Sequence, residues 1–321
     1  MQTRNRIKSI IFLTGLFILL YVASYLLLPY NNMEDSLYKK ANGILKEPKD
    51  TIDYVSIGDS ECSASISPME IWNSYGYTGY NCGVPSQQLQ DTYYLLERLL
   101  KNQSPKVVFL ETNAFYRDFK YINALETAID DTVKKIFPIY KYHNSWKYFH
   151  FYMLKSLGQK AKQEPATIYK GYQYSAIVTP YKSGPYVTET DDVYVIDEQP
   201  LLYLNKITAL CREKGIQLIL YSAPSPKCWS YSKHNAAAAF ANDNQLTYLD
   251  LNLDIDALGI DWTKDSRDDG DHLNYFGAVK VSAYIGNYLR KHTDFIDHRK
   301  DAGFESWNRE LNNYLKLTNE N

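Results

Sequence analysis

Glycine, proline and charge of one sign are all scarce in this chain, and each scarcity excludes a class of protein. Only 15 glycines and 12 prolines occur in 321 residues, which excludes collagen-like and low-complexity chains. The formal net charge is −2, so a nucleic-acid binder that works by neutralising phosphates is excluded as well. A chain of this length buries a core large enough to fold without a metal or a disulfide scaffold.

Cysteine is scarce too, with four residues that form no CxxC pair (Cys62, Cys82, Cys211 and Cys228). Neither these cysteines nor the six histidines show the spacing of a zinc site, so we expect no metal ion and no other cofactor. In an oxidising compartment an even number of cysteines permits two disulfides, in three possible pairings. Buried thiols that pack as small apolar groups are an equal alternative, so cysteine usage leaves the compartment open.

One long apolar run is present, and it covers residues 10–28 without a charged side chain. As a helix it is roughly 28 Å long, close to the thickness of about 30 Å of a hydrocarbon core. Three basic residues precede it and two acidic residues follow it, namely Arg4, Arg6, Lys8, Glu34 and Asp35. Because basic residues stay on the cytoplasmic side, residues 1–9 are predicted to lie inside the cell, residues 10–28 to span the cell membrane, and residues 31–321 to lie outside it.

A cleaved signal peptide is the alternative reading of this run. Its apolar core is usually about 7–15 residues and ends at a small-x-small cleavage site. Here Pro29 and Tyr30 follow a longer run, so the sequence favours a retained single-pass anchor.

Beyond a predicted stalk at residues 29–50, strand-like and helix-like segments alternate. Buried strands are expected at 52–57, 77–84, 107–110, 216–221 and 246–251, and helices at 67–72, 86–102, 201–214 and 275–292. Such alternation predicts a three-layer α/β/α sandwich with a five-stranded, mostly parallel sheet. The expected domain covers residues 51–292, with a long insertion at 114–200 and a helical tail at 293–321.

The first expected strand ends in Gly58-Asp59-Ser60. A serine at the carboxyl end of a strand and just before a helix exposes its hydroxyl at the edge of the sheet. Its backbone N–H is then available to an oxyanion. Taken alone the tripeptide is ordinary turn chemistry, so the hypothesis of a nucleophile at Ser60 needs a partner.

Asp269 and His272, just before the last expected helix of the domain, supply that partner with D-x-x-H spacing. In a Ser–His–Asp relay the histidine takes the serine proton, and the carboxylate fixes its tautomer and stabilises the imidazolium. The alternative is an acidic surface loop. A calcium loop of the EF-hand type fails, because the twelfth residue counted from Asp265 is Phe276 rather than glutamate.

Four short blocks that contain these residues resemble the SGNH (GDSL-type) hydrolase superfamily, over most of residues 52–292. The resemblance implies that Ser60 is the nucleophile, His272 the general base and Asp269 its orienting carboxylate. It also implies an oxyanion hole that includes the backbone N–H of Gly83 and the side chain of Asn113.

Within that superfamily the chain is most similar to a membrane-anchored branch concerned with bacterial exopolysaccharide O-acetylation and teichoic-acid D-alanylation. The resemblance implies a serine O-acyltransferase that faces outward and modifies a surface polysaccharide, with acetyl as the expected group. It also implies a multi-pass membrane O-acyltransferase as a partner. An acetyl esterase with the same site, a D-alanyl transfer protein and a non-catalytic glycan-binding subunit are the alternatives. The chain departs from the family pattern at Glu61-Cys62 and at Ala114.

Two aromatic residues are candidates for contact with a sugar ring. Tyr172 lies in a Tyr-rich stretch of the insertion, and Trp229 follows the fourth expected strand. Amphipathic rings offer a stacking surface together with a polar group. Packing within the core is the alternative for both, since the 30 tyrosines outnumber the 12 phenylalanines and five tryptophans together.

Overall fold

A single parallel sheet is the centre of the computed structural model, which describes residues 2–26, 36–117 and 168–319. The strand order is β2-β1-β3-β4-β5, and every neighbouring pair is parallel. The strands are β1 (Tyr54–Ile57), β2 (Gly79–Asn81), β3 (Val107–Glu111), β4 (Gln217–Ser222) and β5 (Thr247–Asp250). The fold predicted from the sequence, with five mostly parallel strands between helices, is therefore confirmed.

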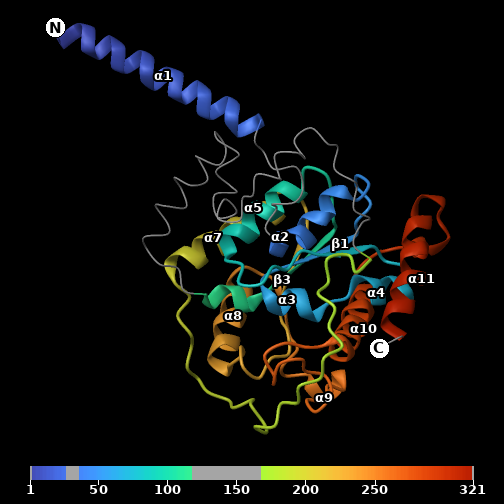
Figure 1. Ribbon diagram of the computed structural model, residues 1–321. Coiled ribbons are helices and arrows are strands. Elements are labelled where there is room, and N and C mark those ends of the chain that lie inside the picture. The colour runs from blue at the N-terminus through green and yellow to red at the C-terminus, as the bar shows by residue number, and fades with distance from the viewer. Residues whose placement is uncertain (1, 27–35, 118–167, 320–321) are drawn as a thin grey trace. The chain divides into compact units, whose positions relative to one another are not determined.

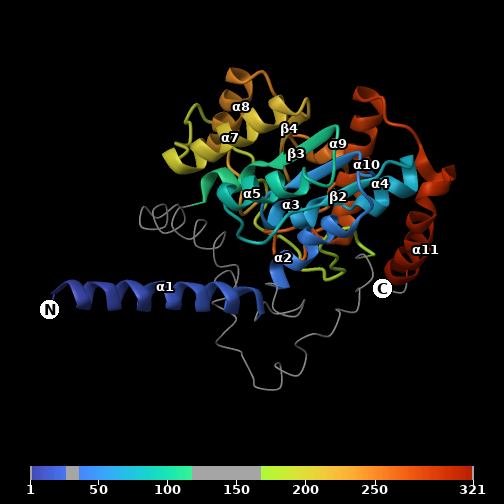
Figure 2. The same cartoon turned by 90° about the horizontal axis from the view of Figure 1, so that it is seen from above.

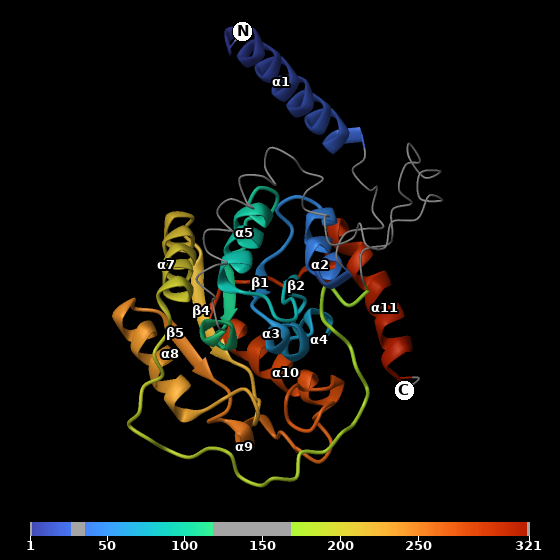
Figure 3. The ribbon, with the colours of Figure 1, turned by 60° about the vertical axis from the view of Figure 1, so that its left-hand side comes forward.

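The central strands are buried because helices cover both faces of the sheet. All residues of β1 and β3 are buried, including the polar Ser56 and Glu111, and the apolar run 107–110 predicts this for β3. A right-handed crossover places α3 (Ser60–Ser65) and α4 (Pro68–Tyr75) on one face, and α10 (Tyr275–His292) packs against both of them. The other face carries α5 (Leu89–Leu99), α7 (Glu198–Glu213) and α8 (Tyr231–Asp243). Figures 1, 2 and 3 show α7 and α8 on one side of this domain, with α4 and α10 toward the other.

The chain divides into two compact units, and the sheet belongs to the second, Lys40–Asp118 with Pro165–Asn321. From the first unit the structure describes helix α1 (Gln2–Leu26) and the start of α2 (Ser36–Ala41). Within the described residues, α1 is the one helix long and apolar enough to cross a membrane, over Arg4–Val22. A signal sequence passes the same test. The last two residues of the predicted span 10–28 lie outside the described residues. Most of the predicted insertion, 114–200, also lies outside them.

The domain begins earlier and ends later than the predicted limits of 51 and 292. The short helix η1 (Asn42–Lys46) is packed inside it, with Ile44 fully buried where the sequence predicted a stalk. In the predicted tail, η5 (His298–Lys300) and η6 (Ala302–Phe304) lead into α11 (Glu305–Asn319). Trp307 and Tyr314 of α11 are buried, and the Trp307 ring lies 5.1 Å from that of Trp72 in α4. Both ends of the domain therefore contribute to its core.

Residues 168–197, which we call the strap, cross the edge of the domain where the strands have their carboxyl ends. The strap appears in yellow-green along the lower border of the domain in Figures 1 and 3. It contacts α3 through the Gln173 N–H and Ser63 carbonyl, and the loop before α10 through the Thr179 N–H and Ser266 carbonyl. The turn helix α9 (Ile255–Leu258) lies on the chain between β5 and that loop.

Candidate active site

The turn between β1 and α3 places three consecutive polar residues at the carboxyl edge of the sheet. Asp59 is the N-cap of α3, and its Oδ1 accepts the Glu61 N–H at 3.0 Å. Ser60 is the first residue of the helix and is half-buried, so its backbone N–H has no acceptor within the helix. The turn passes close to β3, because a Cβ on Gly58 (φ +147°) would lie 2.7 Å from the Cβ of Glu111.

His272 comes to the same edge on the loop that precedes α10. Its Nδ1 lies 2.6 Å from Asp268 Oδ2, and its backbone N–H donates to Asp268 Oδ1 at 2.6 Å. Burial on its own raises the pKa of Asp268, but the hydrogen bonds from the His272 ring and backbone outweigh it and hold that pKa below its usual value. One carboxylate thus fixes both the ring and the main chain of His272.

The prediction that Asp269 orients His272 is wrong about the residue, and Asp268 occupies that position instead. Asp269 has a left-handed backbone (φ +60°), and the next residue, Gly270, has φ +86°. This turn directs the Asp269 carboxylate to Lys227, whose Nζ lies 2.9 Å away, and its side chain is half exposed. The D-x-x-H spacing therefore identifies the loop but not the carboxylate.

The second ring nitrogen of His272 faces the first turn of α3. Nε2 lies 3.8 Å from Oε1 of Glu61, the residue that directly follows Ser60. In the part of the chain that the structure describes, neither atom has a hydrogen-bond partner. The fold therefore brings the unoccupied nitrogen of His272 to the turn that carries Ser60, although the two residues lie 212 positions apart.

Two buried glutamates lie behind this turn. Burial raises the pKa of Glu61 well above its usual value, and the nearby carboxylates of Asp59 and Glu111 raise it further. Burial and the charge of Asp59 likewise raise the pKa of Glu111, although Glu111 accepts backbone N–H groups from Asn113 and Ala223. A buried carboxylate directly after Ser60 is not a feature that the sequence pattern predicted.

Of the two expected oxyanion donors, Gly83 does not have a free N–H. Its N–H donates to the side-chain Oδ1 of Asn81 at 2.9 Å, so the assignment of Gly83 to the oxyanion hole is contradicted. A glycine is required there for packing, because a Cβ would lie 2.5 Å from the backbone N of Ser63. Gly83 therefore lets the loop after β2 approach α3.

Asn113 lies in η2 (Thr112–Tyr116), directly after β3, and its side chain reaches the turn at Ser60. Its Nδ2 donates to Asp59 Oδ2 at 2.9 Å, and Arg117 Nε donates to the same oxygen at 2.8 Å. An amide nitrogen has two N–H groups, so one is left to donate to a ligand. Asp59, which is fully buried, thus holds both Asn113 and the first turn of α3.

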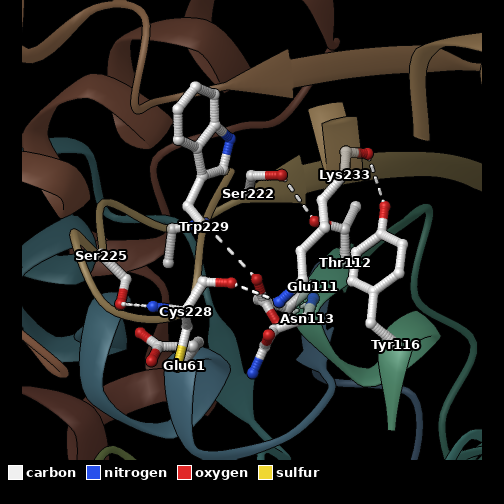
Figure 4. A pocket seen from close by; sticks show the side chains of 11 residues that line it. Glu61, Glu111, Thr112, Asn113, Tyr116, Ser222, Ser225, Cys228, Trp229 and Lys233 are labelled. Atoms are coloured by element: carbon white, nitrogen blue, oxygen red, sulfur yellow. Dashed lines mark hydrogen bonds between the residues drawn. The ribbon is translucent and has the colours of Figure 1, made fainter. Parts of the chain in front are cut away.

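A narrow pocket opens between the ends of β3 and β4, and Figure 4 shows the side chains around it. Glu61, Asn113 and Trp229 line it, together with Tyr116, Ser222, Cys228 and Lys233 among others. Its space for the centres of water molecules is about 10 Å³, roughly what one water needs. The predicted position of Trp229 beside a cleft fits this arrangement, and its Nε1 donates to Asp250 Oδ2 at 2.9 Å.

The other aromatic candidate, Tyr172, cannot touch a sugar ring in this structure. Its side chain is 1% exposed, so it is a core residue under the strap. Lys170 is buried as well, which shows that this part of the strap enters the domain. The packing alternative is therefore the correct one for Tyr172.

Three acidic side chains to which the sequence assigned no role belong to the site: Asp59, Glu61 and Asp268. Signals existed for two of them, Asp59 as the middle residue of Gly58-Asp59-Ser60 and Glu61 as a departure from the family pattern. All four cysteines are free thiols, three of them buried, and the fourth, Cys228, donates to Asp271 Oδ1 at 3.1 Å.

A group of possible metal ligands also lies at this edge of the sheet. Ligand atoms of Glu61, Asp271 and His272 lie within 4.8 Å of one another, close enough for one metal ion.

Comparisons with known proteins add a likeness of fold. No family model matches the chain, and no curated protein matches it in sequence. A GDSL-like lipase from Bacteroides thetaiotaomicron is similar at 12% identity and a TM-score of 0.40, over 79% of this chain and 99% of that one. A candidate acylhydrolase from Bacteroides fragilis is similar at 13% identity and a TM-score of 0.40, over 80% and 96% of the two chains.

A structure from Streptococcus pneumonia, described as a candidate platelet activating factor, is similar at 13% identity and a TM-score of 0.40, over 84% of this chain and 96% of that one. Structures described as hydrolases of the GDSL type are thus among those that the chain resembles. Likeness at this level assigns no activity, so the case for a function rests on the side chains at the edge of the sheet.

Proposed function

We propose that this chain is a serine-dependent O-acyltransferase that faces outward from a bacterial cell membrane. In this proposal it transfers an acetyl group to a surface polysaccharide through an acyl-enzyme on Ser60. One observation carries the proposal: the Nε2 of His272, with Asp268 on its other nitrogen, is unpartnered and faces the turn of Ser60. A serine nucleophile needs a general base that lies next to its turn and has a free ring nitrogen, and His272 meets both conditions.

The chemistry follows in two balanced steps. In the first, Ser60 Oγ attacks the acyl carbonyl while its proton passes to His272 Nε2, and the imidazolium then returns that proton to the departing oxygen of the donor. In the second, an acceptor hydroxyl gives its proton to His272 and attacks the ester carbon, and Ser60 leaves with the proton restored. Asp268 accepts from Nδ1–H throughout, which keeps the lone pair on Nε2 in the neutral ring.

The negative charge of each tetrahedral intermediate needs donors. The N–H of Ser60 and the remaining N–H of Asn113 are the groups available at this edge, each worth about 3 kcal/mol of barrier by analogy with other oxyanion holes. The Asp59 carboxylate orients both donors, since it caps α3 and holds the Asn113 amide.

The pocket favours a small acyl group. Ser60 and His272 do not line it, but Glu61, which follows Ser60, does, and in this proposal the pocket receives the acyl group. Its free space, about that of one water molecule, then suits a methyl group better than a long acyl chain. Two buried carboxyl groups, Glu61 and Glu111, also line the pocket. They favour a cationic acyl group such as D-alanyl as the second candidate, because a buried carboxylate is stabilised by an opposite charge.

The membrane setting is proposed from helix α1, which is long and apolar enough to cross a membrane. A membrane anchor at α1 places the domain at the outer surface, where an acyl group delivered through the bilayer by a multi-pass O-acyltransferase becomes available. The acceptor decides between the two outcomes at Ser60: a sugar hydroxyl gives a transferase, and water gives an acetyl esterase.

The test is to label the full chain in detergent with a serine-directed fluorophosphonate and to locate the adduct by mass spectrometry. We expect an adduct on Ser60 that is absent from Ser60→Ala and at least about 100-fold slower in His272→Ala. Ser104→Ala, which changes an exposed serine far along the chain, should label at the wild-type rate. Labelling that persists in Ser60→Ala would falsify the proposal, and a chain that takes up no label would be better explained as a non-catalytic subunit.

A second measurement identifies the acyl group. Incubation with an aryl acetate should add an acetyl mass to Ser60 that an added oligosaccharide acceptor removes faster than water does. Removal at the same rate with and without acceptor indicates an esterase. Adduct formation only from an alanyl ester indicates D-alanyl transfer.

A further inference from the structure

We infer that Glu61, Asp271 and His272 form a binding site for a divalent transition-metal ion of the zinc class. The three residues come from distant parts of the sequence, the first from α3 and the other two from the loop before α10. Metal binding by these residues does not depend on the proposed acyl transfer, although it involves the same histidine.

The geometry suits an ion better than a direct contact. Two ligands that each lie about 2.0–2.2 Å from zinc are separated by up to about 4.4 Å. The Glu61 Oε1 and His272 Nε2 atoms are 3.8 Å apart, which one ion can span but which is too long for a hydrogen bond. Asp271 completes the set, since one atom from each of the three residues lies within 4.8 Å of the others. Its side chain is 38% exposed, so an ion can reach it from solvent.

The unpaired Oε1 atom of Glu61 is an independent reason to expect a cation. Glu61 is 2% exposed, and its Oε1 has no hydrogen-bond partner among the described residues. Leaving such an atom unpaired in the interior costs free energy that a bound cation removes. The nearby cations are engaged elsewhere, Arg117 with Asp59 and the Lys233 ammonium with the Cys228 carbonyl.

The surroundings of His272 match those of a metal ligand. Its Nδ1 is hydrogen-bonded to Asp268 at 2.6 Å, and this carboxylate–histidine arrangement directs the lone pair of Nε2 outward. Cys228 positions the third ligand, because its thiol donates to Asp271 Oδ1 at 3.1 Å. Imidazole nitrogen with two carboxylates is a donor set that zinc accepts, with positions left for water.

If the proposed function holds, the ion and the serine compete. A metal ion on Nε2 takes the lone pair that would accept the Ser60 proton. Zinc should therefore block the fluorophosphonate reaction reversibly, and a chelator should restore it.

The test measures binding of Zn²⁺ alone to the full chain in detergent, by equilibrium dialysis with elemental analysis. We expect one equivalent in the wild type and in Ser60→Ala, and loss of that equivalent in Glu61→Gln and His272→Ala. Asp269→Asn is the matched control and should retain it, since its carboxylate is paired with Lys227. Cys228→Ser should weaken binding about tenfold, as changes to groups that position a ligand do.

Thermal unfolding distinguishes a variant that has lost the metal site from one that has failed to fold. Zn²⁺ should raise the unfolding temperature of the wild type and of Asp269→Asn, but not that of a folded Glu61→Gln chain. Substoichiometric binding to the wild type, or unchanged binding by Glu61→Gln, overturns the inference and indicates that water occupies the gap. Labelling of Ser60 without zinc binding refutes only this inference, whereas zinc binding without labelling refutes only the proposed function.

Discussion

Replacing Lys170 by methionine should destabilise the domain more than any single change at its surface. Lys170 is 1% exposed and lies under the strap, where its ammonium contacts Glu47 Oε1 at 2.8 Å and Glu310 Oε2 at 2.6 Å. The same ammonium lies 4.2 Å from the centre of the Trp307 ring. One side chain therefore joins the strap to the segment after η1 and to α11.

The magnitude follows from the burial of the partners. At an effective dielectric constant of 20, each ion pair is an attraction of about 6 kcal/mol before the loss of hydration is subtracted. Removing one partner of a buried pair costs about 3–5 kcal/mol, because the charge left behind stays buried and unpaired. Glu47, at 5% exposure, is that charge here. Methionine retains the length and the left-handed backbone of the residue (φ +47°), so backbone strain cancels in the difference.

Chemical denaturation of the full chain in detergent, followed by tryptophan fluorescence, measures this loss. We expect Lys170→Met to lose about 3–5 kcal/mol, and a second change, Glu47→Gln, to restore part of it. Lys264→Met is the control, since its ammonium is 75% exposed and paired with a surface aspartate, and it should change stability by less than about 0.5 kcal/mol. A loss under about 1 kcal/mol for Lys170→Met would show that the cluster is not the buried network described.

Three further predictions test other parts of the structure. Asp268→Asn should slow fluorophosphonate labelling about 10³- to 10⁴-fold by releasing the histidine ring, whereas Asp269→Asn should leave it within about twofold, and the reverse order would return the role to Asp269. Burial raises the pKa of Glu310 in the folded chain above its usual value. The wild type should therefore lose stability relative to Glu310→Gln as the pH rises above about 4.3, the pKa of an unfolded glutamate, toward the raised value. Melting curves from about pH 4 to 8 should show the two chains diverging. Gly83→Ala should cost about 1–3 kcal/mol, because the added Cβ meets the backbone of Ser63, and an unchanged melting temperature contradicts that contact.

The sheet could be predicted from the sequence because its strands are short, mainly apolar segments, of which the central one is a continuous apolar run. Residues 107–110 have no polar side chain, and such a run suits a strand that is covered on both faces. Helix α10 was predicted at its observed limits. It begins there because the side chain of Asn274, its N-cap, accepts the backbone N–H groups of Phe276 and Gly277. Helix α8 was missed, because its four successive alanines, 236–239, give no apolar stripe.

The site was predictable in its location but not in its details. Ser60, Asn113 and His272 stand at the ends of predicted elements, so the topology alone brings them to one edge. The choice between Asp268 and Asp269 depends on a left-handed turn that the spacing does not encode. The burial of Glu61 could not be predicted either, because a charged residue is expected to be exposed, and its burial here depends on the neighbouring strands.

The strap holds the histidine loop through main-chain hydrogen bonds, to which the Tyr181 ring adds packing against Trp262. The N–H groups of Thr179 and Tyr181 donate to carbonyls of that loop, and the Ser175 carbonyl accepts from Tyr275. Side chains such as Ile177 and Val178 point into solvent, with 66% and 45% exposure. The rim of the site can therefore change its amino acids during evolution while the loop beneath keeps its shape. A new acceptor could be accommodated by substitutions in the strap alone.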